Sequence, residues 1–492
     1  MIGSYSHDPA NALSNVYYIK GAKVKANGTE IANQILGTGT ISSPATAVES
    51  ADVSSGKLAF KLESKAETPG TWGQDMTNSS SPQLGGPKVY FSGTCLCNGV
   101  VLTEEYTNDD SQATTIPAHS AEYESNGFCT ACGESKTLHG TGTAEDPYLI
   151  SSVAQLEWFR DQANATSSDY TACAKLVNDI DLSVSSNSTW TPIKTSAYYA
   201  GTFDGDGHTV KNMVVTYSTG GAAGFFGWLA NGSVVMNLTV EGECNSSVPY
   251  LGMIAGFSDG ATITNCTAKG WVNNTSSSGS DLGTGGILGY CSFNGTVRSI
   301  EGCVNYAEVS STLGNVGGIL GSMDFPVTIT KCVNYGSISG NKDNVGGILG
   351  YGCSNNYSFT MSDCANYGNV TTKSSNVAGL VGFVCPMQGT VIKNCYVGPC
   401  AVRGDEHTFV TTFEPSGFYT SFSNIVYSQD CKVYTSYNAS SPASLSDNIA
   451  YYSYNTSDAF VGVSATQIAA GEATYLLNGA VNGGATWTQD LS

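Results

Sequence analysis

The chain has 492 residues, of which only 12% are charged and 58 are glycine, and its formal net charge is −20. This composition is typical of many short strands joined by tight turns, and it argues against a helical bundle. The negative charge argues against nucleic acid and anionic membrane surfaces as partners, and leaves divalent cations, basic surfaces and uncharged glycans. No run of about 18 apolar residues occurs, so we expect no membrane insertion.

The two ends of the chain echo each other. Trp72-Gly73-Gln74-Asp75 and Trp487-Thr488-Gln489-Asp490 lie 487 − 72 = 415 residues apart, and similar segments precede both. The start lacks the basic and apolar regions of a signal peptide, so the chain is either cytosolic or a piece of a longer secreted protein. The echo favours the piece. We expect residues 1–80 to be the tail of a preceding module, with strands and a short helix, and residues 401–492 to be a cap and a module tail that echoes residues 15–76.

Residues 81–139 are predicted to form a small Cys-rich linker module. Cys95 and Cys97, followed by Cys129 and Cys132, have roughly the spacing of a zinc ribbon. As thiolates they would hold Zn²⁺ and fold a segment too small for its own core. As disulfides they would do the same in an oxidising setting, and free thiols are the third alternative. All three interpretations are structural.

Residues 153–163 are predicted to form an amphipathic helix. Its apolar residues Val153, Leu156, Phe159 and Ala163 follow helical spacing, and Ser151-Ser152 can supply the N-cap. A repeat body has an exposed hydrophobic end that must be covered. We therefore expect this helix to cap the N-terminal end of the body that follows.

Two short motifs recur about every 31 residues between residues 140 and 400. The first is a small-residue motif of the form Gly-Gly-Ile-Leu-Gly, with closing glycines at positions 224, 256, 289, 321, 350 and 382. The second contains a cysteine that is followed, in three coils, by Val or Ala, Asn and Tyr. Its cysteines are Cys266, Cys303, Cys332, Cys364 and Cys395.

The residues within each repeat predict an all-β solenoid. Each repeat contains runs of only three to six β-favouring residues, cut by Gly, Asn and Ser, so no amphipathic helix of an α-solenoid fits. The remaining solution is one turn of a parallel β-helix per repeat, with coils ~4.8 Å apart. The five recurring cysteines and the Ile/Leu positions would then form inward ladders, and Asn and Gly would hold the corners.

Two further cysteines occupy equivalent places in adjacent repeats. Cys353 and Cys385 each lie three residues after a closing glycine. Adjacent coils bring Cα atoms to about 4.8 Å, which a disulfide permits. A disulfide between these coils is therefore possible.

Tyr306, Tyr335 and Tyr367 recur at one repeat position, three residues after the ladder cysteine. In a regular strand this spacing places tyrosine and cysteine on opposite faces, although a bend between them would undo it. Outward tyrosines would form a stacked strip able to bind a glycan or another protein. Inward tyrosines would instead cap the core at a corner.

Few residues of the repeats suit catalysis, so we predict no enzyme and no catalytic residue. A polysaccharide lyase needs a basic residue and often Ca²⁺, and a hydrolase needs two carboxylates across the bond. The best carboxylate run, Asp204-x-Asp206 with His208, has the form of a tight coil corner. Asp179 and Asp181 form either a Ca²⁺ site or, as we favour, a solvated pair.

Residues 401–447 lose the repeat motifs. Five aromatic residues gather there, and we expect them to cover the C-terminal end of the bore. They are Phe409, Phe413, Phe418, Tyr419 and Phe422. Residues 465–477 are predicted to form a short helix, with a counterpart near residues 47–62.

The chain also resembles a known class of bacterial surface proteins. The segment Gly140-Thr141-Gly142 to Ile150, with the helix after it, is similar to the opening of many such β-helix domains, and residues 201–210 continue the pattern. The Gly-Gly-Ile-Leu-Gly units resemble the GLUG repeat of adhesin-like proteins from gut and other anaerobic bacteria. The resemblance covers roughly residues 140–430. It implies a pectate-lyase-like right-handed parallel β-helix, a cell-surface location and no catalytic residues.

These observations together predict a structural or adhesive extracellular protein that binds a glycan or a protein of a host or neighbouring cell. No cofactor is required, although Zn²⁺ at the cysteine cluster and Ca²⁺ remain compatible with the sequence. The first alternative is a self-assembling filament subunit, because the echoing ends would allow head-to-tail docking. A polysaccharide-degrading enzyme is the lesser alternative.

Overall fold

The structure is a computed structural model. It describes residues 16–19, 24–26, 29–31, 45–48, 53–63, 70–78, 81–91, 94–96, 100–103, 106–108, 140–150, 153–185, 187–277, 283–292, 298–353, 359–385, 389–411, 420–450, 459–478 and 486–489. The chain divides into two compact units, Met1–Leu138 and His139–Ser492.

The described part of the first unit consists of short strands and a short helix. Its elements are β1 (Val16–Ile19), β2 (Val24–Ala26), β3 (Thr29–Ile31), β4 (Ala45–Val48), α2 (Lys57–Glu63), β5 (Trp72–Gly73), β6 (Gln83–Leu84), β7 (Tyr90–Phe91), β8 (Thr94–Leu96), β9 (Val100–Thr103) and β10 (Tyr106–Thr107). Strands β1 and β4 pair in parallel. The other pairs are antiparallel and join β2 to β3, β5 to β6, β7 to β10 and β8 to β9.

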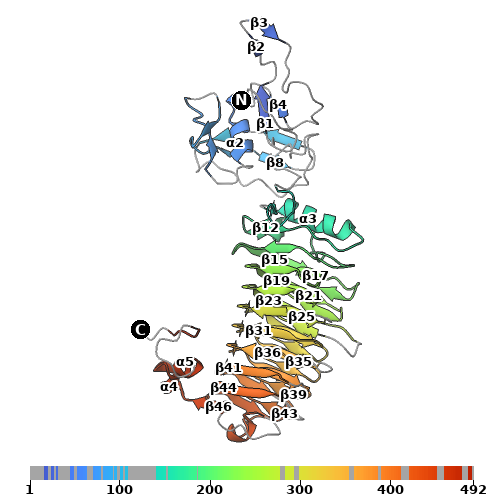
Figure 1. The fold of residues 1–492 in the computed structure, drawn as a ribbon, viewed down its shortest axis with the longest axis vertical. Helices are drawn as coiled ribbons and strands as arrows, with labels where there is room; N and C mark the ends of the chain where they lie inside the picture. The colour runs from blue at the N-terminus through green and yellow to red at the C-terminus, as the bar shows by residue number, and fades with distance from the viewer. Residues whose placement is uncertain are drawn as a thin grey trace. The chain divides into compact units, whose positions relative to one another are not determined.

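The second unit is a parallel β-helix, as the sequence predicts. Its strands stack coil upon coil along one axis (Figure 1). A complete coil contributes strands to three parallel sheets, which comprise 23, seven and six strands among the described residues. We call them the long sheet, the second sheet and the third sheet.

The long sheet contains β11 (Tyr148–Ile150), β12 (Ala174–Leu176), β13 (Ile180–Asp181), β14 (Thr202–Asp204), β15 (Thr209–Val215), β18 (Val234–Met236), β19 (Thr239–Ser246), β22 (Thr262–Thr264), β23 (Thr267–Asn274), β26 (Arg298–Glu301), β27 (Val304–Asn305), β28 (Glu308–Ser311), β31 (Val327–Thr330), β32 (Val333–Asn334), β33 (Ile338–Gly340), β36 (Thr360–Ser362), β37 (Ala365–Asn366), β38 (Val370–Thr372), β41 (Val391–Val397), β42 (Ala401–Arg403), β44 (Ser421–Ser428), β45 (Lys432–Tyr434) and β46 (Phe460–Val463).

The second sheet contains β16 (Ala222–Ala223), β20 (Tyr250–Gly252), β24 (Gly283–Gly285), β29 (Val316–Gly317), β34 (Val345–Gly346), β39 (Ser375–Ala378) and β43 (Glu406–Phe409). The third sheet contains β17 (Phe226–Leu229), β21 (Ala255–Ser258), β25 (Leu288–Cys291), β30 (Leu320–Met323), β35 (Leu349–Gly352) and β40 (Val381–Val384).

Equivalent residues of successive coils lie in register and fill the bore. One column of the long sheet runs through Ile263, Ile300, Ile329, Met361 and Ile392, and all of its members are buried. The Ile/Leu positions of the small-residue motif form a second inward column, for example Leu288, Leu320 and Leu349. Each coil therefore buries its apolar face only against its two neighbours.

Asparagines hold one corner of the coil. Asn237 and Asn265 adopt φ values of 54° and 52°, a left-handed conformation that asparagine tolerates better than most residues. The Asn265 amide donates to Oδ1 of Asn237 at 3.2 Å, and the Asn237 amide donates to Asp204 at 3.0 Å. This corner is thus linked from coil to coil by side chains as well as by backbone.

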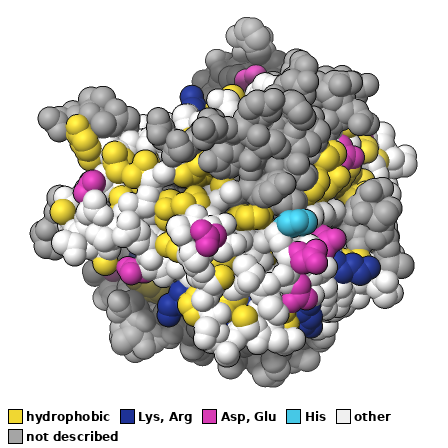
Figure 2. Space-filling view, turned by 90° about the horizontal axis from the view of Figure 1, so that it is seen from below, with side chains coloured by type: hydrophobic (Ala, Val, Ile, Leu, Met, Phe, Trp, Pro, Cys, Tyr) yellow, Lys and Arg dark blue, Asp and Glu magenta, His cyan; other side chains and the backbone are white. Residues whose placement is uncertain are grey.

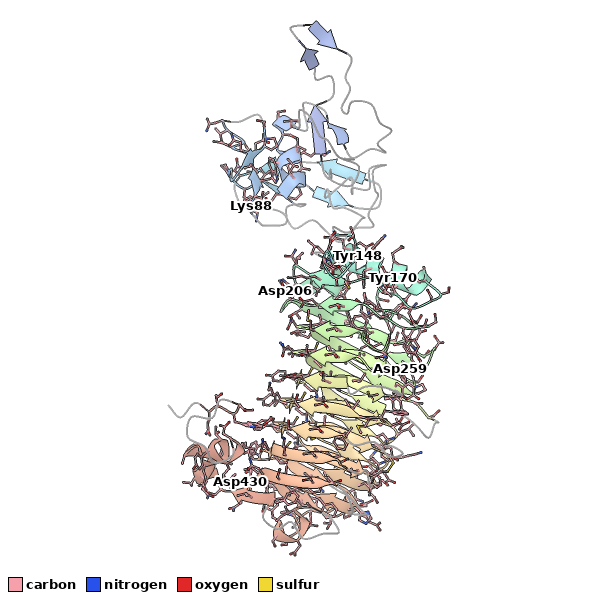
Figure 3. All side chains as sticks on the ribbon, viewed as in Figure 1. Lys88, Tyr148, Tyr170, Asp206, Asp259 and Asp430 are labelled. Carbon is pink, nitrogen blue, oxygen red and sulfur yellow. A yellow bond between two sulfur atoms is a disulfide. The ribbon has the colours of Figure 1, made fainter. Side chains whose placement is uncertain are left out.

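Helix α3 (Val153–Ala165) lies at the N-terminal end of the coil stack (Figure 1). Its residues Leu156, Phe159 and Ala163 are fully buried. The Phe159 ring packs edge-on against Tyr170 and Tyr199, with centroids 5.4 and 6.1 Å away. Figure 3 shows Tyr148 and Tyr170 at this same end. The helix covers the bore as predicted, while its expected N-cap, Ser151-Ser152, lies outside the described residues.

A buried lysine closes the C-terminal end of this helix. Nζ of Lys194 donates to the carbonyl oxygens of Ala163, Thr166 and Ser168 at 3.1, 2.7 and 3.0 Å. These carbonyls lie at the end of α3, where the helix dipole favours positive charge. Burial lowers the pKa of Lys194 from its ordinary value. The three contacts tie the cap helix to the first coils.

The coil continues past residue 400, so the predicted end of the repeat body is wrong. Strands β42, β44 and β45 pair in parallel with the coils before them, and β46 pairs with β44. Phe422 lies in register with Ile392 and extends its inward column, rather than covering the end of the bore. Phe409 belongs to β43. Phe413, Phe418 and Tyr419 lie outside the described residues.

Two short helices follow the last strand, α4 (Ala465–Ala469) and α5 (Glu472–Leu477). They pack beside the long sheet near β41 and β44, where Ala473 and Leu477 contact Tyr396 and Val426. The Asn424 amide donates to the Leu476 carbonyl at 2.7 Å. The helical segment thus covers part of the outer face of the last coils (Figure 1).

The echoing ends fold alike. Gly56 precedes α2 with φ 84°, and Gly471 precedes α5 with φ 85°. Nε2 of Gln74 donates to the Ser54 carbonyl at 3.5 Å, and Nε2 of Gln489 donates to the Ile468 carbonyl at 2.7 Å. The sequence echo is therefore also an echo of local structure. No helix among the described residues is long and apolar enough to cross a membrane.

Candidate functional site

The three repeat tyrosines point outward from the long sheet. Tyr306, Tyr335 and Tyr367 are 51%, 46% and 38% exposed. Neighbouring rings stack with centroids 4.9 and 5.0 Å apart and planes 6° and 9° from parallel. We call them the tyrosine strip. Burial raises the pKa of Tyr335 and of Tyr367, so their hydroxyl groups keep their protons and can donate hydrogen bonds.

The residue before each tyrosine explains why the ring points outward. Asn305, Asn334 and Asn366 are fully buried and in register. The Asn305 amide donates to Oδ1 of Asn334 at 2.8 Å, and the Asn334 amide donates to Oδ1 of Asn366 at 2.7 Å. We call these three residues the asparagine ladder. Because side chains alternate along a strand, inward asparagines direct the tyrosines to the surface.

The strip ends at the C-terminal side where the chain covers it. Tyr367 contacts Tyr396 edge-on at 5.6 Å, and Tyr396 is buried beneath α5. Gly398 lies beside the Tyr367 ring, and a side-chain Cβ there would approach that ring to 2.4 Å. The absence of a side chain at Gly398 therefore gives the last tyrosine its room.

On the N-terminal side the same column changes from aromatic to charged. Lys269 precedes Tyr306 in register, and Glu241 precedes Lys269. A neighbouring column on the same outer face contains Glu243, Trp271 and Glu308. Trp271 is 52% exposed, the most exposed of the strand-borne aromatic side chains on this face.

Beside Trp271 the outer face is hollowed. A cavity of about 730 Å³ is lined by Asn212, Met213, Val214, Glu241, Gly242, Glu243, Lys269, Gly270, Trp271 and Tyr306. We call it the Trp271 hollow. Trp271 also borders a second hollow of about 400 Å³ with Glu243, Asn245, Asn273 and Ser310. Volumes of this order suit small ligands or a few sugar units.

Two glycines lie on the floor of the Trp271 hollow. Gly242 and Gly270 lie in register on adjacent coils. A Cβ at Gly242 would come within 2.0 Å of the Met213 carbonyl oxygen, and one at Gly270 within 2.0 Å of the Gly242 carbonyl oxygen. Gly270 also has φ 102°. Close approach of the preceding coil therefore requires glycine at both places, and the glycine backbone forms part of the lining of the hollow.

Sequence reasoning finds the tyrosines but misses Trp271 and its hollow. One feature of the sequence could have indicated this site. Trp271 follows Gly270 at an outward position of its strand, and its coil has Lys269 where the later coils have the repeat tyrosine. The hollow itself depends on how Gly242 and Gly270 meet between coils, which the repeat spacing alone does not reveal.

The five ladder cysteines lie inside the bore. Cys266, Cys303, Cys332, Cys364 and Cys395 are fully buried. Their thiols donate to nearby carbonyl oxygens, for example from Cys332 to Thr330 at 3.3 Å. Burial raises the pKa of Cys332 and of Cys364 well above the ordinary value. Buried, protonated thiols of this kind act as small core side chains.

Cys353 and Cys385 are joined by a disulfide, with Cα atoms 4.8 Å apart. The bond links two adjacent coils directly after β35 and β40. Tyr351 Oη lies 3.8 Å from Sγ of Cys385. We call this disulfide the staple. It lies at the C-terminal ends of two strands of the third sheet, whereas the tyrosine strip lies on the long sheet.

A second pair of cysteines also lies at equivalent places on adjacent coils, but no disulfide joins them. Cys400 and Cys431 directly precede Ala401 and Lys432, which are in register, and both are free. A hydrogen bond from the Cys400 thiol lowers the pKa of Cys431 from its ordinary value. Cys431 is therefore the more readily ionised thiol of the pair, and at 6% exposed it is closer to the surface than the fully buried ladder cysteines.

We expect oxidised glutathione to convert this pair into a second disulfide. The Cys431 thiolate attacks the reagent and releases one glutathione thiolate, and Cys400 then displaces the other. Peptide mass spectrometry after alkylation should show the linked Cys400 and Cys431 peptides, while the ladder cysteines remain alkylatable only after unfolding. With Cys400→Ser, a lasting glutathione adduct on Cys431 should replace the link. Absence of both products would contradict the assignment.

The carboxylates considered for catalysis or Ca²⁺ are engaged by protein groups. Asp179 accepts from the Thr209 amide at 2.9 Å and contacts His208 at 3.3 Å. Asp181 accepts from the Asn212 amide at 2.7 Å, which lowers its pKa to about 2. Asp206 pairs with Lys175 at 3.1 Å. Within the described residues no group of three or more His, Cys, Asp or Glu side chains is placed to hold a metal ion.

The predicted cysteine cluster falls largely outside the described residues. Cys95 belongs to β8 and lies opposite Val101. Cys97, Cys129 and Cys132 are not among the described residues. The choice between Zn²⁺, disulfides and free thiols therefore stays open.

Comparisons with known proteins give two similarities. Over 176 residues the chain is 30% identical to halomucin from Haloquadratum walsbyi, a match that covers 34% of this chain and 2% of halomucin. A crystal structure of a candidate immunoglobulin A1 protease from Bacteroides ovatus superposes with a TM-score of 0.42 at 18% identity, covering 69% of this chain and 90% of that one. No family model matches the chain, so the resemblance to GLUG repeats stays a prediction.

Proposed function

We propose that this chain is part of an extracellular surface protein, and that its β-helix is a structural rod whose tyrosine strip adheres to glycans. The observation that carries the proposal is the exposed, nearly parallel stack of Tyr306, Tyr335 and Tyr367. Exposed aromatic groups in a row mark interaction surfaces more often than chance. The sequence similarity to halomucin, a mucin by name, supports an extracellular location.

The strip has the chemistry of a polysaccharide surface. It repeats every coil at about 5 Å, which is close to the length of one pyranose unit in an extended chain. Its hydroxyl groups form a row of donors and acceptors, and its ring edges supply apolar contact. Seen along the coil axis from the C-terminal end, the described surface carries both acidic and basic side chains among uncharged ones (Figure 2). The stacked tyrosines themselves carry no charge, which suits an uncharged partner.

We expect Tyr335→Ala to weaken glycan binding about tenfold, because it removes the central ring and separates its two neighbours. Affinity gel electrophoresis in neutral polysaccharides measures this directly. Tyr475→Ala is the matched control, since Tyr475 is 42% exposed on α5 and lies outside the strip. Equal retention of both variants, or no retention of the unaltered chain, would contradict the proposal. Release of reducing ends would instead support the polysaccharide-degrading alternative.

A second candidate, a filament subunit, is favoured by the common fold of the two echoing ends. Each end places a glycine of positive φ before a helix and a glutamine amide on a preceding carbonyl. Electron microscopy across a concentration series, with and without Ca²⁺, separates the candidates. Fibres with an axial repeat near one module would support the filament. Discrete rods at every concentration would leave the adhesive surface protein.

A further inference from the structure

The tyrosine strip offers few ring faces to a ligand. Because Tyr335 stacks on both neighbours, its two faces are covered, and Tyr367 is covered by Tyr335 and Tyr396. Only Tyr306, at the N-terminal end of the stack, turns a face toward a coil without a tyrosine. That face borders the Trp271 hollow. A sugar ring that stacks on an aromatic face therefore finds its place there.

Trp271 supplies the second aromatic surface. Its side chain is 52% exposed. Trp271 and Tyr306 come from adjacent coils and lie on the same outer face of the long sheet. Between them the glycine floor of Gly242 and Gly270 exposes backbone rather than side chains. A flat ring can approach this floor closely.

The polar groups around the hollow are arranged to bind hydroxyl groups. Glu241 and Glu243 point outward from β19, and Lys269 points outward from β23. Glu241 and Lys269 are register partners on adjacent coils. Among the described residues, Glu243 accepts a long contact from the Asn245 amide at 3.5 Å. All three side chains are exposed and line the hollow, so a ligand can reach them.

The charge of the hollow restricts which sugars suit it. Two carboxylates and one ammonium group line it, on a chain whose net charge is −20. A uronic or sialic acid would bring a third carboxylate against the same sign of charge, whereas a neutral pyranose can donate hydroxyl protons to the glutamates.

We propose that the Trp271 hollow is the principal sugar-binding subsite of this protein, and that it takes a pyranose without negative charge and rejects acidic sugars. The inference rests on the glycan-binding function proposed above and adds its location and its selectivity. In this arrangement the sugar stacks on Trp271, its hydroxyl groups bind Glu241, Glu243 and Lys269, and the rest of the glycan runs along the tyrosine strip.

Calorimetric titration with three tetrasaccharides tests the inference. Cellotetraose and the tetramer of N-acetylglucosamine are the neutral probes, and tetragalacturonic acid is the acidic probe. We expect the unaltered chain to bind at least one neutral probe, and to bind the acidic probe at least tenfold more weakly. Trp271→Ala should weaken neutral binding at least tenfold, Trp271→Phe less than that, and Tyr475→Ala not at all. Unchanged thermal unfolding of each variant excludes misfolding, as expected for exposed positions.

Removing the carboxylates tests the selectivity separately. The double variant E241Q/E243Q should reduce the ratio of the affinities for the neutral and acidic probes at least fivefold. Glutamine keeps the shape of glutamate but does not repel the carboxylates of the acidic probe. Neutral binding that survives Trp271→Ala but falls with Tyr335→Ala would overturn this subsite and leave the proposed function intact. Preference for the acidic probe would overturn the selectivity. If the unaltered chain retains no polysaccharide and binds no probe, the proposed function fails together with the subsite.

Discussion

Replacing Asn334 with alanine should lower the free energy of unfolding by about 4 kcal/mol, because the change removes three buried hydrogen bonds and leaves buried donors and acceptors with fewer partners than they need. Asn334 is fully buried. It donates to Oδ1 of Asn366 and to the Gly336 carbonyl, at 2.7 and 2.9 Å, and accepts from Asn305 at 2.8 Å. A net hydrogen bond contributes about 1 kcal/mol, and a buried group left unsatisfied costs about 1–3 kcal/mol more. Denaturant unfolding followed by circular dichroism measures the loss.

Asn245→Ala is the matched control for this prediction. Asn245 is also a strand asparagine, but it is exposed and its amide makes one long contact, to Glu243 at 3.5 Å. Its replacement should change the unfolding free energy by less than about 0.5 kcal/mol. If Asn334→Ala destabilised the protein no more than this control, the asparagine ladder would contribute nothing beyond a surface amide.

Gly318→Ala should destabilise the β-helix by about 3 kcal/mol or prevent its folding, although it adds only one methyl group. The new Cβ would lie 2.1 Å from the Gly347 carbonyl oxygen of the next coil and 2.5 Å from Cγ of Asn334. Backbone and ladder would both have to move, and overpacking of this kind costs about 1–3 kcal/mol or more. Thermal unfolding and the yield of folded protein measure the effect.

Gly232→Ala provides the comparison, because Gly232 has φ 84° but a Cβ added there would meet no atom within 4 Å. It should cost about 1 kcal/mol, from the left-handed backbone alone. Equal losses at the two glycines would mean that close approach of the coils is not what requires glycine at position 318.

The repeat spacing predicts the fold well, because the stacking of coils determines both the spacing and the fold. Stacked coils require equivalent residues at nearly equal intervals, so the intervals between Cys303, Cys332 and Cys364 reveal the length of a coil. Alternation along the strand then predicts which residues point inward. The prediction that asparagines hold the corners describes Asn237 and Asn265 well.

The same reasoning does not anticipate the asparagine ladder. A polar amide beside an apolar column, as at Asn334, is expected at the surface or at a turn. It is buried here because the amide of each coil satisfies the amide of the next. The partner amide lies about one repeat away in sequence, and the local sequence pattern does not show whether the two amides are close enough to form a hydrogen bond.

The sequence misplaces the end of the repeat body for a related reason. The small-residue motif reports the close approach of coils in the second and third sheets, and that motif stops before residue 400. The long sheet requires only inward apolar residues, which Phe422, Ile425 and Val433 continue to provide. Loss of one motif therefore does not mean loss of the coil.

For the surface rod proposed above, the Cys353–Cys385 disulfide has a mechanical consequence under tension. Hydrogen bonds between coils run along the axis, so tension on the C-terminal end would peel the coils away one at a time. A covalent bond between adjacent coils cannot be peeled, and it keeps the residues between Cys353 and Cys385 from extending. Trp271, Tyr306 and Tyr335 all precede this bond in the chain. Under force, the tension would pass through this bond directly to Cys353, so the coils that carry the proposed sugar site would be loaded without first releasing the residues between the two cysteines.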